Sequence, residues 1–215
     1  MSNAEQNNNK DAVVVRLDHT ARNEARSILY HAYRDDPTFQ YLFDHRKPGY
    51  DQRVRATIRE LIDLYVEHEQ DAVGVMMNDT LVAVAFIGEP ELRMNLADQF
   101  GWRLRMVLTA GFASTRRYLD YHKTIQALLP QPQAHQLPLM GVDPKHQHKG
   151  IGRILLQAVE KLCEENPRGS GLVLDTGNSR YLPFYESEGF RSLGKVRLGD
   201  FEDHVMFRKV VAQAG

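Results

Sequence analysis

The residues from Leu137 to Glu165 constrain the fold most strongly, because they combine a short apolar run, a turn and an amphipathic helix. The apolar run ends at the turn pair Asp143-Pro144, as expected of a buried or half-buried strand. Asn166-Pro167 is expected to end the helix. Apolar residues at three- and four-residue spacings give this helix one buried face: Ile151, Ile154, Leu155, Ala158, Val159, Leu162 and Cys163.

The beginning of this helix carries several basic residues, although a helix amino terminus favours negative charge. Two glycines there, Gly150 and Gly152, allow another group to approach the backbone closely. A phosphate or pyrophosphate on the N–H groups of residues 149–153 would satisfy those donors and neutralise the charge. We therefore predict an anion-binding site; the alternative is a tight turn with a solvated basic loop. The basic residues are Lys145, His146, His148, Lys149 and Arg153.

Two common phosphate-binding motifs do not fit this segment. A Walker-type loop requires Gly-Lys-Ser/Thr four residues after a glycine, and no such run occurs. The dinucleotide fingerprint requires a third glycine or alanine, but position 155 is Leu.

Two sequence blocks instead match a known family. Residues 147–152, Gln-His-Lys-Gly-Ile-Gly, fit the Q/R-x-x-G-x-G/A signature, and this segment resembles the GNAT acetyl-CoA-dependent N-acetyltransferases. The second block follows in the expected order, with a strand between, and fits N…(F/L)Y-x-x-x-G-F. Tyr181 departs from the family, which often has a small residue there. The resemblance covers 137–190, and the first half agrees in element order. The second block matches at Asn178, Phe184, Tyr185, Gly189 and Phe190.

The remaining patterns predict an α/β (α+β) fold, a mixed and strongly twisted central sheet flanked by helices on both faces. We expect residues 1–10 to be a disordered tag or tail, and 11–215 to form a single domain. A helical pair broken near Gly111 is expected at about 91–129, either as a substrate-selecting insertion or as added core. Strands are expected at 12–17, 72–77, 81–87, 172–174, 190–196 and 204–210, with further helices at 21–32 and 52–68.

The resemblance implies a chemistry and a binding set. Acetyl-CoA would be the co-substrate, and a primary amine of a small molecule or peptide would attack it directly while both are bound. The pyrophosphate would lie on the amides of 147–153, and the pantetheine arm would pair with the backbone of the preceding strand. The implied cofactor-binding residues are Met140, Gly141, Val142, Gln147, His148, Lys149, Gly150, Ile151, Gly152, Arg153 and Asn178.

Tyr185 is the catalytic candidate that the resemblance implies, because a phenol stays protonated at neutral pH and can donate to the departing thiolate. The alternative is an aromatic residue packed beside Phe184. The group that deprotonates the amine is left open, with three candidates: His135, Glu89 and His122.

Composition excludes other classes of function. The net charge of -1 argues against recruitment to nucleic acid or to an anionic membrane. No apolar run is long enough for a membrane span. The single cysteine, Cys163, fits a reducing cytoplasm, and no residue spacing indicates a metal site. The function predicted is an acyltransferase, as a monomer or homodimer. The alternative is an acyl-CoA-binding sensor without turnover.

Overall fold

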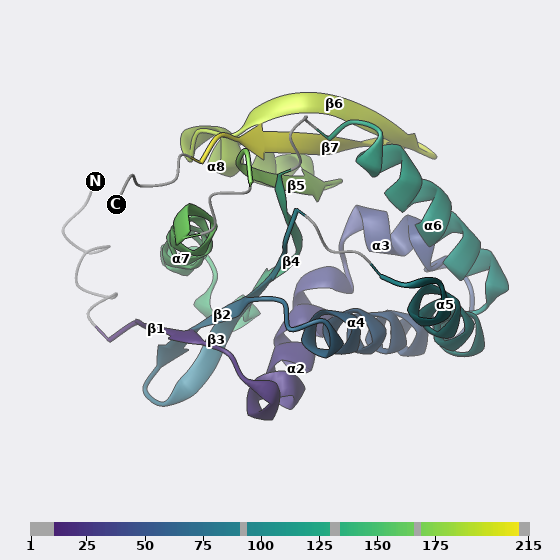
Figure 1. The fold of residues 1–215 in the computed structure, drawn as a ribbon, viewed down its shortest axis with the longest axis horizontal. Helices are drawn as coiled ribbons and strands as arrows, with labels where there is room; N and C mark the ends of the chain where they lie inside the picture. The colour runs from purple at the N-terminus through teal and green to yellow at the C-terminus, as the bar shows by residue number, and fades with distance from the viewer. Residues whose placement is uncertain (1–10, 91–93, 130–133, 166–168, 211–215) are drawn as a thin grey trace.

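The structure is a computed structural model that describes residues 11–90, 94–129, 134–165 and 169–210. The strands of these residues form one sheet in the order β1-β2-β3-β4-β5-β7-β6 (Figure 1). Neighbouring strands are antiparallel except β4 and β5, which are parallel. The strands are β1 (Val13–Arg16), β2 (Ala72–Met77), β3 (Thr80–Gly88), β4 (His135–Val142), β5 (Leu172–Thr176), β6 (Arg191–Leu198) and β7 (Phe201–Arg208).

The parallel pair, β4 and β5, separates soon after it begins. His135 pairs with Leu172 and Gln136 with the next residue of β5, and the described residues form no further pair between these strands. On its other side β4 stays paired with β3 as far as Val142. A backbone edge without a partner strand presents unpaired N–H and C=O groups. The later part of β4 therefore has one edge open to side chains or to a ligand.

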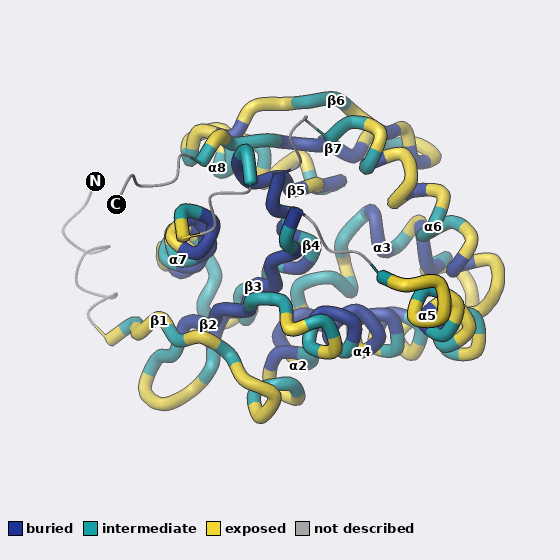
Figure 2. The backbone as a smooth tube through the Cα atoms, in the orientation of Figure 1, coloured by how far each residue is buried: buried dark blue, intermediate teal, exposed yellow. Residues whose placement is uncertain are grey.

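Helices cover both faces of the sheet (Figure 1). On one face α7 (Ile151–Glu165) packs its apolar stripe on β2, β3 and β4, and α8 (Leu182–Ser187) joins the same apolar cluster. On the other face α2 (Arg22–Tyr33) and α4 (Tyr50–Glu67) pack on the sheet beside α3 (Pro37–Leu42). Figure 2 shows the central strands buried between these two layers. Short 3-10 turns lie at His19–Ala21, Pro144–His146 and Ser179–Tyr181.

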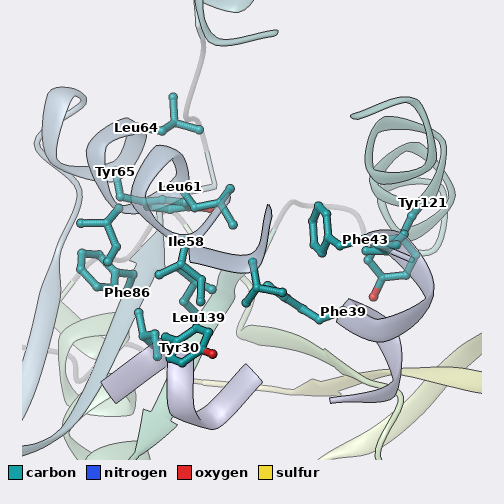
Figure 3. Close-up of a cluster of buried hydrophobic side chains, with 14 of the residues drawn as sticks. Tyr30, Phe39, Phe43, Ile58, Leu61, Leu64, Tyr65, Phe86, Tyr121 and Leu139 are labelled. Atoms are coloured by element: carbon teal, nitrogen blue, oxygen red, sulfur yellow. The ribbon is translucent and has the colours of Figure 1, made fainter. Parts of the chain in front are cut away.

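The larger of the two cores lies between the sheet and the helices of the α2–α4 face (Figure 3). Its aromatic side chains include Phe39 and Phe43, whose ring centroids are 5.2 Å apart. Figure 3 places Tyr121, from a later helix, close to Phe43 at one end of this cluster. Each fully buried large apolar side chain contributes about 1.5–3 kcal/mol, so this face holds the α-helical layer firmly on the sheet.

The region after β3 contains the predicted helical pair. Its helices are α5 (Leu96–Ala110) and α6 (Phe112–Gln126), and they meet at Gly111, whose φ of 84° ends the first helix. α5 packs on α4, and α6 packs on α5 and β6. The pair thus extends the layer on the α2–α4 face and reaches the far edge of the sheet.

Most other elements agree with the patterns that predicted them. The β2–β3 hairpin turns at Asn78-Asp79, both at positive φ, as a two-residue turn between twisted strands requires. Several boundaries differ by one to three residues. The largest shift is in β7, which begins at Phe201 rather than at 204 because the hairpin turn uses only Gly199 and Asp200. The expected tail at 1–10 and the helix stop at 166–167 lie outside the described residues. One sheet unites all the described strands, which supports our proposal of a single domain from 11 to 215.

No helix in the described part of the chain is long and apolar enough to cross a membrane.

The close packing of α2 on β4 generates a first prediction. A Cβ added at Gly141 would lie 2.9 Å from the Ala32 Cβ and 3.1 Å from Leu29 Cδ2, so α2 would have to move. We expect Gly141→Ala to lower the free energy of unfolding by about 1–3 kcal/mol. Gly152→Ala is the control, because its Cβ would meet only ordinary contacts at 3.9 Å. Urea unfolding measures both; equal stability of the two variants would contradict this packing.

Candidate functional site

The loop between β4 and α7 turns sharply and exposes its backbone. Asp143 begins the turn by accepting a hydrogen bond from the Lys145 N–H at 2.8 Å. His148 and Gly150 then adopt positive φ, at 59° and 79°. His148 is not a glycine, so this conformation costs free energy that the surrounding structure must offset. The two positive-φ residues aim the chain into the first turn of α7.

Five consecutive backbone donors at this corner have no acceptor. Within the described chain no hydrogen bond uses the N–H groups of residues 148–152. The next donors, on Arg153 and Ile154, bond to the Gly150 carbonyl at 3.1 and 3.2 Å and start the helix ladder. Unpaired N–H groups at a helix amino terminus form a ready site for an anion. We call residues 148–152 the cradle.

The basic side chains around the cradle differ in their exposure and in whether they already have a partner. Arg153 is tied to α8, because its Nε lies 2.6 Å from the Glu188 carboxylate. Lys149 donates to the Lys145 carbonyl at 2.9 Å, although its side chain remains exposed. His148 is exposed as well. Positive charge therefore surrounds the cradle, while the Arg153 guanidinium also holds α8 against the start of α7.

The open edge of β4 is occupied by side chains. The Met140 N–H donates to the Tyr33 hydroxyl at 3.1 Å, and the Val142 carbonyl accepts from Gln147 Nε2 at 3.1 Å. These are the two residues expected to pair with a pantetheine arm. Gly141 between them is explained by α2, which packs against it. The edge thus points its polar groups toward the space between β4 and β5.

Tyr185 and Asn178 lie after β5, across from this edge. The Tyr185 ring packs against Phe184 and Phe190, with centroids 5.2 and 5.8 Å away. Its hydroxyl has no hydrogen-bond partner among the described residues. Burial raises the pKa of Tyr185, and nearby Tyr181 and Asp175 add to this, so the phenol stays protonated at neutral pH. Asn178 caps the following 3-10 turn, accepting from the Arg180 N–H at 3.2 Å.

A second group of residues near Tyr185 is marked by no sequence motif. Asp175 on β5 accepts a hydrogen bond from the Tyr121 hydroxyl of α6 at 2.5 Å. Asp203 on β7 is fully buried and accepts from the Thr38 hydroxyl at 2.5 Å. Burial raises the pKa of both carboxyl groups, and for Asp203 the Asp175 carboxylate adds to the effect. The only sequence signal was an aspartate ending the apolar run Leu172–Leu174.

The three candidates for a base fall in different places. His135 lies at the start of β4, five residues or about 17 Å along the strand from Met140. Glu89 lies at the same end of the sheet, and its negative charge acts on the pKa of His135 in the direction opposite to burial, which lowers it. Both are therefore remote from the cradle. His122 stacks on Tyr118 of α6 at 6.3 Å and follows Tyr121 in the chain, and burial lowers its pKa.

Other chemistry finds little support in the described residues. They contain no group of three or more His, Cys, Asp or Glu side chains that could hold a metal ion. Cys163 is buried, and burial raises the pKa of its thiol to about 12, which makes it a poor nucleophile. A hollow of about 500 Å³ between α3 and the β6–β7 turn, lined by residues such as Gln40 and Phe201, includes neither Asp175 nor Tyr185.

Comparison with known proteins identifies the fold. The family model for the acetyltransferase (GNAT) domain matches residues 106–192. A crystal structure of histone acetyltransferase HPA2 and related acetyltransferase from Corynebacterium glutamicum is similar at a TM-score of 0.68. It shares 17% identity, and the match covers 95% of this chain and 98% of that one.

Two further solved structures support the same fold. The PaiA N-acetyltransferase from Thermoplasma acidophilum, in complex with coenzyme A, matches with TM-score 0.57 and 13% identity over 92% of this chain and 98% of that one. The ribosomal-protein-S18-alanine N-acetyltransferase from Escherichia coli matches with TM-score 0.53 and 16% identity over 95% and 96%. The predicted resemblance to the GNAT superfamily and its mixed α/β fold is confirmed.

The buried carboxyl group of Asp203 generates a prediction about stability and pH. A carboxyl whose pKa is raised by folding stabilises the folded state below its unfolded value of about 3.9, and this is lost as pH rises through the folded pKa. Asparagine cannot ionise, so we expect Asp203→Asn to be about 1–3 kcal/mol more stable than wild type at pH 8, with a smaller gain at pH 5. Urea unfolding at both pH values measures this.

The exposed Asp200 on the neighbouring turn provides the control. Asp200→Asn should change stability little and equally at both pH values. A gain for Asp203→Asn that does not depend on pH would contradict a buried, ionisable Asp203.

Proposed function

We propose that this protein is an N-acetyltransferase that transfers the acetyl group of acetyl-CoA to a primary amine of a small molecule or peptide, by direct attack with both substrates bound. The observation that carries the proposal is the cradle, five unpaired N–H groups at a basic helix start that adjoins an open strand edge. The GNAT fold supports it, because that family uses acetyl-CoA.

The cradle residues would hold the diphosphate of the coenzyme. Their N–H groups supply directed donors, and the side chains of Lys149 and Lys145 supply positive charge beside the exposed His148. Gln147 and Arg153 would hold the two ends of this loop in place. Gln147 donates a hydrogen bond to the Val142 carbonyl, and Arg153 donates one to Glu188 at the end of α8. Asn178, which follows β5, would face the coenzyme from the β5 side of the gap between β4 and β5. The Thermoplasma relative with bound coenzyme A supports this use of the fold.

The open edge of β4 would hold the pantetheine arm and the thioester. An extended amide-bearing ligand can pair with such an edge as an added strand would. The Met140 N–H, which the Tyr33 hydroxyl now occupies, would donate to the thioester carbonyl and stabilise the negative charge that develops on its oxygen. In the complex the Tyr33 phenol is then free to rotate and donate as well.

Tyr185 would protonate the departing thiolate. Its hydroxyl is unpaired, its pKa is raised, and its ring is fixed by two aromatic neighbours. The neutral amine nitrogen attacks the thioester carbon, the carbon–sulfur bond breaks, and the phenol proton passes to sulfur. The proton that the nitrogen loses as the amide forms then restores the phenol through solvent. A sensor that holds acyl-CoA without turnover requires no such acid, so the free hydroxyl favours the enzyme. We place the reaction in the cytoplasm because Cys163 is an unpaired thiol.

A first experiment tests turnover. With acetyl-CoA and a panel of amines, polyamines, aminoglycosides and peptides, wild type should release free thiol. We expect Tyr185→Phe to lower kcat by about 10²–10⁴-fold while the Kd for CoA stays unchanged. Tyr181→Phe, which removes an exposed hydroxyl from the preceding turn, is the control and should retain activity. Tight CoA binding with no thiol released by any acceptor would favour the sensor instead.

A second experiment tests the cradle. Gly152 is the better position for a substitution, because Gly150 has positive φ and any side chain there would be strained. We expect Gly152→Glu to weaken CoA binding at least about tenfold through bulk and charge repulsion, measured by calorimetric titration. Gln157→Glu adds the same charge to an exposed position of α7 and should bind CoA like wild type. Equal affinity in both variants would place the diphosphate elsewhere.

A further inference from the structure

Asp175 and Asp203 face the same side of the sheet. Asp175 pairs directly with Val205 on β7, and Asp203 lies two residues before Val205 on that strand. Val173 and Val205 belong to the core of the α2–α4 face, and side chains two residues apart on a strand share a face. The two carboxylates are therefore diagonal neighbours on adjacent strands, within about 7–8 Å of each other.

The hydrogen bonds of these two carboxylates leave an acceptor unsatisfied. The Tyr121 hydroxyl, with one proton, donates to Asp175 Oδ2, and the Thr38 hydroxyl donates to Asp203 Oδ2. Asp203 Oδ1 is buried and has no hydrogen-bond partner. Tyr121 lies close to Asp203 as well and contributes to its pKa. A buried oxygen that is left unpaired in this way costs free energy until a donor reaches it.

The local charge is also unbalanced. Asp36 caps α3 near the same point, and burial raises its pKa to about 6, with Asp175 adding to the effect. No Lys, Arg or His side chain of the described residues forms an ion pair with Asp36, Asp175 or Asp203. Buried carboxylates without a cation are expensive. A cationic ligand would supply the missing charge.

Solvent can reach the first of these carboxylates. Asp175 is exposed although its neighbours Leu174 and Thr176 are buried. Protein atoms nevertheless surround it closely enough for burial to raise its pKa. Asp175 is therefore partly enclosed by protein and still open to solvent. A purely structural carboxylate would have no need of such access.

Tyrosines from four helices lie near enough to this carboxylate to feel its charge. Burial raises the pKa of each, and the charge of Asp175 adds to the effect, so all remain phenols at neutral pH. Their hydroxyls can hydrogen-bond an amine, and their ring faces attract alkylammonium groups. One also contacts the Met140 N–H and another is the proposed acid, so this cluster adjoins the thioester position. The tyrosines are Tyr33, Tyr65, Tyr118 and Tyr185.

Building on the proposed function, we propose that Asp175 receives the acceptor amine and removes its proton, and that the acceptor is a small dicationic amine, such as a diamine or polyamine. The ammonium binds Asp175, a proton passes from nitrogen to the carboxylate, and the neutral nitrogen attacks the thioester carbon. As the carbon–sulfur bond breaks, Tyr185 gives its proton to the thiolate. The nitrogen loses its second proton as the amide forms; through solvent this proton restores the Tyr185 phenol, and Asp175 releases its own proton to solvent. Asp36 provides the negative charge that favours a second ammonium, and the unpaired Asp203 Oδ1 offers it a hydrogen-bond acceptor. Tyr121 and Asp203 are positioning residues.

Matched acceptors of one length test the substrate class. Thiol release from acetyl-CoA is measured with 1,4-diaminobutane, 1-aminobutane and 4-aminobutanoate. We expect kcat/KM for the diamine to exceed that of the monoamine by at least about tenfold and that of the carboxylate-bearing amine by about a hundredfold. An equal or higher kcat/KM for 4-aminobutanoate overturns the inference, while the acetyltransferase proposal stands.

Variants test the role of Asp175. Asp175→Asn should lower kcat/KM for the diamine by about 10²–10⁴-fold and leave the Kd for CoA unchanged. Asp120→Asn, which removes a carboxylate from the exposed face of α6, is the matched control and should behave like wild type. Loss of activity in Asp120→Asn to the same extent, or full activity in Asp175→Asn, overturns the assignment.

The pH profile separates positioning from simple structural support. Tyr121 donates a hydrogen bond that favours the ionised Asp175, so Tyr121→Phe should move the acid limb of kcat/KM to higher pH. Asp203→Asn should leave the limb near its wild-type pH, because burial and the Asp175 charge keep Asp203 protonated where Asp175 ionises. An unchanged limb in Tyr121→Phe overturns the network. Calorimetric titration of the CoA-loaded protein with 1,4-diaminobutane applies even if no acceptor turns over: binding that Asp175→Asn loses supports the site, and no binding to wild type overturns it.

Discussion

The separation of β4 from β5 is the constraint on which the rest of this structure depends. Two parallel strands that remained paired would satisfy each other's backbone along their length and leave no edge for a ligand. Here the pairing stops after Gln136, and the polar groups of Met140 and Val142 turn to side chains instead. The cradle lies at the end of one strand, and Asp175 and Tyr185 follow the other. Both proposed substrates would thus meet where the sheet opens.

Local physical chemistry was sufficient to predict the strand, turn and helix on which the proposed coenzyme site lies. The stripe of α7, the turn at Asp143-Pro144 and the glycines at 150 and 152 are all encoded within thirty consecutive residues. The basic residues at the start of α7 are unfavourable near the positive end of the helix dipole unless an anion is bound, and this conflict is visible in the sequence. The hairpin at Asn78-Asp79 and the helix break at Gly111 were predictable for the same reason, since each depends on residues close together in the chain.

The proposed acceptor side depends on contacts between distant residues and could not be predicted in this way. Asp175, Tyr121 and Asp203 come from β5, α6 and β7, and no spacing in the sequence relates them. Only the register of β5 with β7 and the packing of α6 toward the far edge of the sheet bring them together. The helical pair α5–α6 therefore does more than extend the core, because one of its tyrosines reaches the candidate site. The base candidates His135 and Glu89 stay predictions; their place at the opposite end of β4 from the cradle becomes visible only in three dimensions.

The central claim is that a diphosphate binds to the backbone N–H groups of residues 148–152. Amide chemical shifts measured by NMR during titration with CoA test it most directly, since each donor is observed separately. The account predicts large, saturable shifts for Lys149, Gly150, Ile151 and Gly152, with small changes in the carboxyl-terminal half of α7. Saturable binding of CoA that leaves these four amides unshifted would contradict it.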